Sequence, residues 1–256
     1  MEFYKFNGAG NDFVVIDNRL GRLSLDTERI AAMCNRRFGI GADGLMTLES
    51  AQGTEYDFEM VYYNSDGRIG SMCGNGGRCI AAFAHMLGIG SRLHFRAYDG
   101  PHTAEIDMWD GHEGVVSLGM RSVPSEAVSM VLDGWYLDTG SPHYVQRVSG
   151  LETFDVVREG RRIRYMAELF PQGTNVDFVE ERPDGRLFVR TYERGVEDET
   201  YACGTGITAS AIASFRRGAK PSAVGSDGRV KYDIQARTDR LSVEFTPKKE
   251  DAFSDV

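Results

Sequence analysis

The strongest constraint in this 256-residue sequence is a pattern that occurs twice. Cys73 and Cys203 each begin a Cys-Gly-x-Gly motif that runs into small and apolar residues, and a glycine follows each run. Alanine-rich runs of this kind predict helices, and a glycine commonly follows the end of a helix. Both motifs therefore predict a helix that starts directly after a cysteine.

The likeness extends to the residues before each motif. A strand-like run ends at Asn64 in the first copy and at Glu193 in the second, nine and ten residues before the cysteines. Asn11 and Ser141 both lie 62 residues before their cysteine. A repeat of about 130 residues is too long for a solenoid unit and is typical of a duplicated domain.

The periodicity lapses at residues 121–126, which suggests a boundary there. We expect an N-terminal half, residues 1–121, that carries Cys73, and a C-terminal half, residues 122–256, that carries Cys203. The tail, residues 247–256, is expected to pack back on the first half.

The rest of the chain reads as scaffold in which strands outnumber helices. Strands are predicted at residues 13–17, 57–64, 93–98, 134–138, 174–180 and 241–245. Residues 26–37 predict an amphipathic helix, with Asp26 or Ser24 as N-cap and Gly39 beyond its end. Hairpin-like spacings dominate, so we expect a mixed α/β fold rather than a doubly wound one. Residues 39–44 match Gly-x-Gly-x-x-Gly, but a helix precedes them and a strand follows, the reverse of a dinucleotide site.

Composition excludes several classes of function. The 38 acidic and 29 basic residues give a net charge of −9, which argues against binding to nucleic acid or an anionic membrane. The start of the chain does not resemble a signal peptide, and no apolar run approaches the ~18 residues of a membrane span. The four cysteines lack the close pairs of a zinc site, so we expect no metal. Cys34 and Cys79 are expected to be buried, reduced thiols in a cytoplasmic protein.

A cysteine before a glycine-rich helix start has a specific chemistry. The start of a helix exposes unpaired N–H groups and a partial positive charge, and glycine lets a ligand approach them. Thiols in such places have pKa values of about 3.5–7.5. The dipole alone supplies roughly one pKa unit, so local hydrogen bonds must contribute as well.

Two such cysteines facing one cavity would form a two-base site. One thiolate would remove an α-proton while the other cysteine, as a thiol, delivers a proton to the opposite face. The N–H groups of Gly74, Asn75, Gly204 and Thr205 would hold the substrate carboxylate as the carbanion develops. This arrangement predicts racemisation or epimerisation of an amino acid without a cofactor.

Three motifs together resemble the diaminopimelate epimerase family. They are Gly8-Ala9-Gly10-Asn11-Asp12-Phe13, Met72-Cys73-Gly74-Asn75-Gly76-Gly77-Arg78-Cys79, and Tyr192-Glu193-Arg194-Gly195 with Ala202-Cys203-Gly204-Thr205-Gly206. The resemblance implies interconversion of LL- and meso-diaminopimelate, on the route to lysine and cell-wall peptide, by two cysteines and no cofactor. It also implies two pseudo-symmetric halves, each a curved, mostly antiparallel sheet around a central helix, with the active site in the cleft between them.

The resemblance assigns roles to individual residues. Cys73 and Cys203 match the acid/base pair. The matching substrate-binding positions are Asn11, Asn64, Asn175, Glu193 and Arg194. A Glu–Arg pair with amides suits the ammonium and carboxylate at the distal end of the substrate.

Two positions depart from some family members. Gly44 stands where those members have Gln, and Ser141 stands where they have Asn. Both changes shorten polar contacts to the distal end of the substrate. His143 is an auxiliary candidate beside Cys203, although a lone histidine near a proline-containing turn is more often structural.

The same residues also allow purely structural interpretations. Either Cys-Gly-x-Gly taken singly reads as a buried cysteine beside a turn, Asn64 opens a turn signal, and Glu193 and Arg194 suit a solvated hairpin tip. A related racemase acting on proline-like substrates, an anion- or metal-binding protein and a thiol redox protein remain open. Arg78 and the Glu193–Arg194 pair favour a substrate with a charged far end. The oligomeric state is left open, with a homodimer among the expectations.

Overall fold

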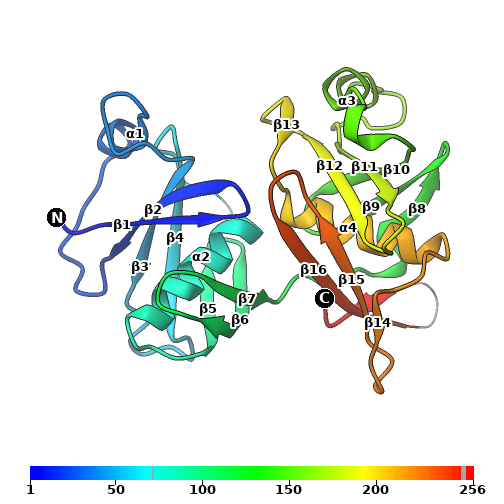
Figure 1. Cartoon of the computed structure of the whole chain (residues 1–256). Helices are drawn as coiled ribbons and strands as arrows, with labels where there is room; N and C mark the ends of the chain where they lie inside the picture. Colours follow the sequence, from blue (N-terminus) through cyan, green and yellow to red (C-terminus); the bar gives the residue numbers. More distant parts are fainter. Residues whose placement is uncertain (71, 249–251) are drawn as a thin grey trace. The chain divides into compact units, whose positions relative to one another are not determined.

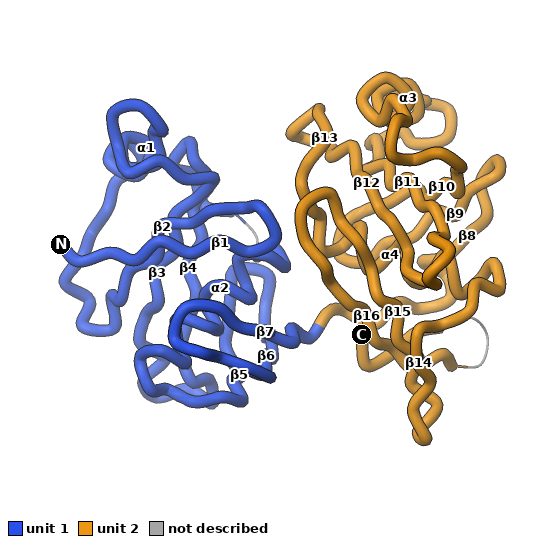
Figure 2. The backbone as a smooth tube through the Cα atoms, in the orientation of Figure 1, with its two compact units in different colours: residues 1–119 blue, residues 120–256 orange. Residues whose placement is uncertain are grey.

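The computed structural model describes residues 1–70, 72–248 and 252–256. The chain divides into two compact units, unit 1 with residues 1–119 and unit 2 with residues 120–256 (Figure 2). Each unit has its own curled sheet and its own central helix (Figure 1).

Within the described residues, unit 1 is a seven-stranded sheet whose neighbours follow chain order. Its strands are β1 (Tyr4–Gly8), β2 (Asn11–Asp17), β3 (Gly44–Glu49), β4 (Phe58–Asn64), β5 (Arg92–Ala97), β6 (Gly100–Trp109) and β7 (Gly114–Leu118). The β2–β3 and β4–β5 pairs are parallel and the others antiparallel. A parallel pair needs a crossover connection. The helices α1 (Thr27–Cys34) and α2 (Gly74–Met86) lie in these two connections.

Strand β2 is covered on both faces, which explains its unbroken apolar run. Phe13 and Val15 pack in the cluster formed by α2, whereas Val14 and Ile16 pack in the cluster formed by α1. Successive side chains of a strand point to opposite faces, so one strand serves both helices. Each large apolar side chain buried in this way contributes roughly 1.5–3 kcal/mol.

Helix α1 is shorter than the predicted residues 26–37. Asp26 is its N-cap as expected, and its carboxylate accepts a hydrogen bond from the Arg29 N–H at 2.8 Å. The helix ends at Cys34 because Asn35 takes extended backbone angles. The Asn35 side chain accepts hydrogen bonds from the N–H groups of Arg37 and Phe38, both at 2.9 Å. A side chain that captures local N–H groups competes with helix continuation, which the apolar pattern alone did not reveal.

Unit 2 repeats this plan with additions. Its strands are β8 (Val128–Val131), β9 (Gly134–Asp138), β10 (Pro142–Arg147), β11 (Asn175–Glu181), β12 (Leu187–Glu193), β13 (Asp198–Thr200), β14 (Ala223–Val224), β15 (Val230–Gln235), β16 (Arg240–Pro247) and β17 (Phe253–Ser254). Its helices are α3 (Val156–Arg164) and α4 (Gly204–Arg216), with short 3-10 turns at Ser125–Ala127 and Leu151–Thr153. The pairs β10–β11 and β12–β15 are parallel, and α3 and α4 lie in their connections.

The two units share one sequence of pairings. From β1 to β7 and from β9 to β17, antiparallel and parallel pairs follow one another in the same order, with β8, β13 and β14 as additions. Helix α2 corresponds to α4, and α1 corresponds to α3. The mixed α/β class and the repeated sheet-around-helix plan predicted from the sequence are therefore confirmed.

The described part of the tail pairs inside unit 2. Strand β17 lies beside β16, and Phe253 also bridges to Val123. Residues 249–251, which fall within the predicted tail 247–256, lie outside the described residues. Packing of the tail on the first half stays a prediction.

Candidate active site

In unit 1, Cys73 lies directly before the start of α2. Cys73 is the N-cap residue, and its Sγ accepts a hydrogen bond from the Gly76 N–H at 3.2 Å. Cys73 is half-buried. A methyl group on Gly76 would lie 3.2 Å from this sulfur and 3.3 Å from the Met46 Sδ. Glycine at position 76 therefore lets the helix start sit close against both the cysteine and the sheet.

A chain of amides adjoins this helix start. The Asn75 Nδ2 donates to the Asn11 Oδ1 at 2.6 Å, and the Asn11 Nδ2 donates to the Asp43 Oδ2 at 3.1 Å. Arg78 donates to the Asn75 Oδ1 at 2.5 Å. The structure thus brings together the predicted residues Asn11 and Asn75, and Asp43 fixes the orientation of the Asn11 amide.

Asn64 and Gly74 are two further predicted site residues of unit 1. Asn64 is exposed at the end of β4, where its N–H and C=O close a turn with Arg68 and Gly67. The turn predicted at Asn64 is confirmed, and its role in substrate binding stays a prediction. Gly74 is the first residue of α2 and is buried.

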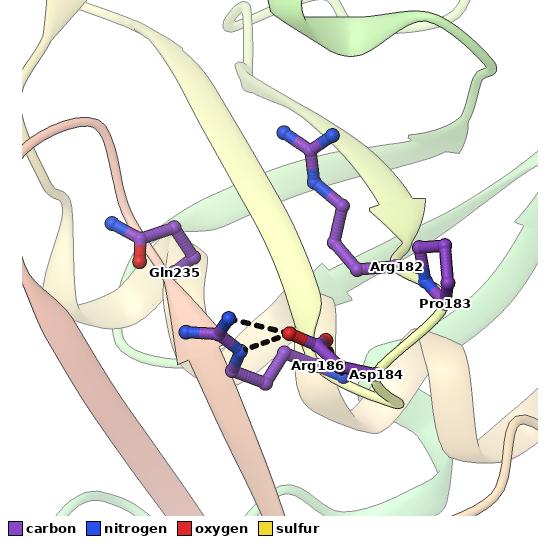
Figure 3. Close-up of a pocket in the computed structure, with 5 residues that line it drawn as sticks. All are labelled: Arg182, Pro183, Asp184, Arg186 and Gln235. Atoms are coloured by element: carbon purple, nitrogen blue, oxygen red, sulfur yellow. Dashed lines mark hydrogen bonds and ion pairs between the residues drawn. The ribbon is translucent and has the colours of Figure 1, made fainter.

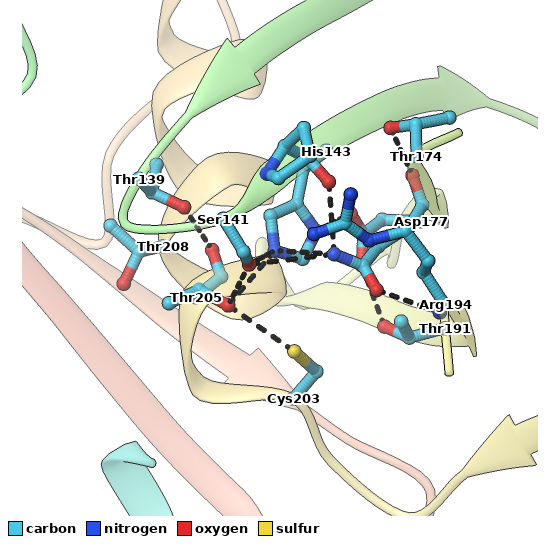
Figure 4. Close-up of polar contacts among 12 residues, drawn as sticks. Thr139, Ser141, His143, Thr174, Asp177, Thr191, Arg194, Cys203, Thr205 and Thr208 are labelled. Atoms are coloured by element: carbon cyan, nitrogen blue, oxygen red, sulfur yellow. Dashed lines mark hydrogen bonds and ion pairs between the residues drawn. The ribbon is translucent and has the colours of Figure 1, made fainter. Parts of the chain in front are cut away.

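The start of α4 in unit 2 treats its cysteine differently. Cys203 is again the half-buried N-cap residue, but its sulfur accepts no capping hydrogen bond from the helix. Instead, the Cys203 Sγ lies 3.3 Å from the Thr205 Oγ1 (Figure 4). The Thr139 hydroxyl donates to the Thr205 C=O at 2.9 Å and helps to fix the first turn, which follows Gly204.

His143 lies beneath this helix start, inside strand β10 rather than in a turn. Its side chain is fully buried, and its Nε2 lies 2.9 Å from the Thr205 Oγ1 and 3.0 Å from the Ser141 Oγ. Its Nδ1 lies 2.7 Å from the Asp177 Oδ2. Burial lowers the pKa of His143, but the Asp177 carboxylate and the Cys203 thiolate outweigh burial and raise it to about 10.

Asp177 is a site residue that the sequence motifs do not predict. This carboxylate is fully buried, and its Oδ1 accepts a hydrogen bond from the Thr191 hydroxyl at 2.7 Å. Strand β11 pairs with β10 on one side and with β12 on the other, so His143, Asp177 and Thr191 share the face covered by α4. A signal was available, because an aspartate inside an otherwise apolar strand must find a partner when it is buried.

Asn175 holds the end of strand β12 in place. Its Nδ2 donates to the Pro142 C=O at 2.9 Å, and its Oδ1 accepts from the Arg194 N–H at 2.8 Å. Burial raises the pKa of Glu193, so its carboxyl group is not a freely solvated one. The structure therefore brings Asn175, Glu193 and Arg194 together, and their side chains do not form the simple solvated tip that was the alternative interpretation.

A separate hollow in unit 2 holds none of these residues. It has a volume of about 330 Å³ and is lined by Arg182, Pro183, Asp184, Arg186 and Gln235 (Figure 3). Arg186 pairs with Asp184, and Arg182 pairs with Glu152 and Glu180. Its positive charges are matched by carboxylates, so the hollow offers no uncompensated charge for an anion.

The other two cysteines are buried in the core and do not contribute to the candidate site. Cys34 and Cys79 are free and buried, which confirms the prediction. Burial raises the pKa of Cys79 to about 12, so this thiol stays protonated at neutral pH.

Among residues 1–70, 72–248 and 252–256, no cluster of three or more His, Cys, Asp or Glu side chains could hold a metal ion. Over the same residues, no helix has both the length and the apolar character to cross a lipid bilayer.

Comparisons with known proteins identify the family of this chain. The model of the diaminopimelate epimerase family matches residues 3–122 and 135–247. The diaminopimelate epimerase of Chlorobaculum tepidum is 50% identical over 216 residues, which cover 83% of this chain and 82% of the relative. That of Flavobacterium psychrophilum is 47% identical over 248 residues, which cover 96% and 91%.

Solved structures share the fold at low identity. A phenazine biosynthesis protein of the PhzF family from Bacillus anthracis has a TM-score of 0.71 at 12% identity, covering 99% of this chain and 95% of that one. A hydroxyproline epimerase from Agrobacterium vitis has a TM-score of 0.63 at 16% identity, covering 95% and 82%. Because these identities are low, the structural likeness supports the fold, while the family follows from the sequence matches. The chain belongs to the diaminopimelate epimerase family, whose members are isomerases.

Proposed function

We propose that this chain interconverts LL- and meso-diaminopimelate by moving a proton at the α-carbon, with Cys73 and Cys203 as the acid and base and without a cofactor. The observation that carries the proposal is that each cysteine is the N-cap of a glycine-rich helix in its unit. Membership of the family supports the substrate. Both sulfurs are half-buried, so neither is sealed in the core.

The reaction needs one cysteine as a thiolate and the other as a thiol. The thiolate takes the α-proton from one face of the substrate, and the thiol gives its proton to the opposite face of the resulting carbanion. The second cysteine is then the thiolate, so the enzyme is set for the reverse reaction. N–H groups of Gly74, Asn75, Gly204 and Thr205 would bind the α-carboxylate, where negative charge accumulates in the transition state.

The distal end of the substrate carries an ammonium and a carboxylate. Arg194 offers a guanidinium that can bind a carboxylate through two hydrogen bonds, and Glu193 offers a carboxyl group for the ammonium. Asn11, Asn64 and Asn175 supply amides for the same recognition. The hydrogen bonds that hold the side chains of Asn11 and Asn175 support this role, because side chains held in one orientation bind at a lower cost in entropy.

Two small residues are expected to loosen distal recognition. Gly44 has no side chain to offer, and a methyl group there would lie 2.5 Å from the Tyr62 Cε2. Ser141 is already hydrogen-bonded to His143 and Thr205, which makes it an auxiliary group near Cys203 rather than a long-reaching one.

The same proposal places the reaction before lysine and peptidoglycan precursors. We place it in the cytoplasm, because two reduced thiols persist in a reducing compartment. The chemistry as proposed needs no second copy of the chain, and light scattering in solution tests the expected homodimer.

Exchange of the α-proton in heavy water tests the proposal. Wild-type protein should incorporate deuterium into LL-diaminopimelate and form the meso isomer. Cys73→Ala and Cys203→Ala should each lower the rate of epimerisation by about 10²–10⁴-fold, the range for loss of a general acid or base. Cys79→Ala, in the helix that Cys73 caps, is the matched control and should retain activity.

Two outcomes would contradict the proposal. Deuterium entering L-proline but not diaminopimelate would favour the related racemase. Activity that survives formation of a Cys73–Cys203 disulfide would favour a redox protein, because a disulfide can neither take nor give a proton.

A further inference from the structure

We propose that Asp177 is a positioning residue that acts on Cys203 through His143 and Thr205. The inference rests on the proposed role of Cys203 as an acid and base, but every contact that carries it lies within unit 2. The structure arranges these four residues in an unbroken series of hydrogen bonds from the core to the sulfur (Figure 4).

The first step is the orientation of His143. Asp177 and His143 are both fully buried, and the Asp177 Oδ2 lies 2.7 Å from the His143 Nδ1. The other carboxylate oxygen is occupied by the Thr191 hydroxyl, which donates to it. A carboxylate only accepts, so the proton between Asp177 and His143 is assigned to Nδ1. The ring is thereby fixed with its Nε2 toward the start of α4.

The second step is the Thr205 hydroxyl, which lies between His143 and Cys203. Its Oγ1 is 2.9 Å from the His143 Nε2 and 3.3 Å from the Cys203 Sγ. A hydroxyl can accept one hydrogen bond and donate another. A charged His143 has two hydroxyl acceptors for its Nε2–H, Thr205 at 2.9 Å and Ser141 at 3.0 Å. When Thr205 is the acceptor, its own hydrogen can be directed at the sulfur. A donor aimed at the sulfur stabilises the thiolate over the thiol.

The third step is the close approach of α4 to the Asp177–His143 pair. A methyl group on Gly206 would lie 2.3 Å from the Asp177 Oδ1 and 3.1 Å from the His143 Cε1. The first turn of the helix therefore rests directly on the pair, with no side chain between them. Movement of the carboxylate would displace the turn that carries Thr205.

Three titratable groups face His143 from the elements packed around it. They are Asp177 on β11, Glu193 at the end of β12 and Cys203 before α4. Asp177 lies 2.7 Å from the His143 ring and is the most deeply buried of the three. It is therefore the one whose charge most directly keeps His143 protonated beside the cysteine.

The test measures the reactivity of the Cys203 thiol directly. In the full-length Cys73→Ala protein, iodoacetamide labelling of Cys203 is followed against pH by peptide mass spectrometry. Asp177→Asn removes the charge and keeps the shape. We expect it to slow labelling at pH 7 by about 10-fold or more and to move the labelling midpoint to higher pH, the effect of losing a hydrogen bond to a charged group. In the Cys73-containing protein, kcat should fall by a similar factor while KM changes little.

Thr205 provides a second, independent pair of variants. Thr205→Val removes the hydroxyl and should slow labelling as Asp177→Asn does, whereas Thr205→Ser keeps the hydroxyl and should restore it. The matched control is Asp133→Asn, another unit 2 carboxylate, which accepts from Tyr144 and Gln146, both at 2.9 Å. It should leave labelling of Cys203 unchanged.

A merely structural role for Asp177 gives a different result. If folded Asp177→Asn protein labels Cys203 with the wild-type pH profile, the inference is wrong. If Asp177→Asn does not fold, wild-type labelling in Thr205→Val overturns the inference equally. A shifted labelling profile in a protein that does not epimerise diaminopimelate would support the inference while removing the proposed function, so the two failures are distinguishable.

Discussion

The starts of α2 and α4 occupy equivalent places in their units but rest on different layers. Beneath α2 lies Met46, which is opposite Tyr62 in the sheet. Beneath α4 lies Asp177, which is opposite Thr191. The third residue after each cysteine, Gly76 or Gly206, meets the Met46 sulfur in one unit and the Asp177 carboxylate in the other.

This difference separates what the repeated fold requires from what the chemistry requires. Both units have a glycine where the helix lies against the sheet, and both have a cysteine as N-cap. The surroundings of the sulfur are set by the residues beneath. Cys73 accepts a hydrogen bond from a backbone N–H, whereas Cys203 contacts a hydroxyl that leads to a buried acid–histidine pair.

Placing a buried aspartate in unit 1, at the position equivalent to Asp177, should have the largest effect on stability. Met46→Asp would bury a carboxylate with no cationic partner, and an uncompensated buried charge costs about 3–5 kcal/mol. Urea unfolding should show this loss in the free energy of unfolding, and the loss should shrink at low pH, where the carboxyl group is neutral.

The control and the sharper test use the same position. Met46→Leu conserves volume and should cost less than about 1.5 kcal/mol. Phe13 lies two strand positions from Met46 in register, as His143 does from Asp177. Adding Phe13→His to Met46→Asp should therefore recover part of the loss. If Phe13→His recovers none of the free energy of unfolding lost in Met46→Asp, the sheet positions beneath α2 and α4 are not equivalent.

The next largest effect is expected from alanine at the two glycines, which should lower stability in unit 2 but not in unit 1. Gly206→Ala would place a methyl group 2.3 Å from a buried carboxylate oxygen, an overpacking that costs about 1–3 kcal/mol. Gly76→Ala meets two sulfurs at 3.2 and 3.3 Å, and the gain of about 0.5–1 kcal/mol from alanine in a helix offsets that contact. Thermal unfolding of both variants should show a drop in Tm for Gly206→Ala and little change for Gly76→Ala. Equal drops would contradict the comparison.

Because of the Asp177–His143 pair, we expect the stability of unit 2 to fall at alkaline pH. The pKa of His143 is raised in the folded protein to about 10. The folded chain thus holds a proton that the unfolded chain releases near its ordinary pKa of about 6.5. The stabilisation is complete below that value and is lost as pH rises toward 10. The free energy of unfolding should therefore fall more steeply over this range in wild type than in His143→Gln. Identical slopes would show that the pair is not charged.

The smallest effect is expected for the ion pairs that Asp12, near the start of β2, makes with Lys5 and Arg36. Hydrogen bonds from Arg36 and Lys5 hold the pKa of Asp12 well below its usual range. This stabilisation is present above the unfolded pKa of about 3.9 and disappears as pH falls below it. Because Arg36 is largely exposed, Arg36→Gln should cost less than about 1 kcal/mol at pH 7 and nothing in strong acid. Arg68→Gln, on an exposed and longer ion pair, is the control.

The sequence predicted features that depend on neighbouring residues. Both cysteine N-caps follow from a motif and the helix directly behind it, and the duplicated plan follows from the matched spacings. Asp177 escaped prediction because its partner His143 lies 34 residues away and meets it only through the β10–β11 register. The predicted range of helix α1 is too long because the Asn35 side chain, rather than the apolar pattern, sets the end of the helix.

The closing strand of unit 2 suggests a route for protein engineering. The Met120 N–H donates to the Val256 C=O at 2.8 Å, and Val123 and Phe253 exchange two backbone hydrogen bonds at 2.8 Å. The first and last residues of the unit are therefore adjacent. A short peptide joining them, with new termini opened in an exposed loop such as residues 225–228, should give a circular permutant of unit 2 with its sheet unbroken.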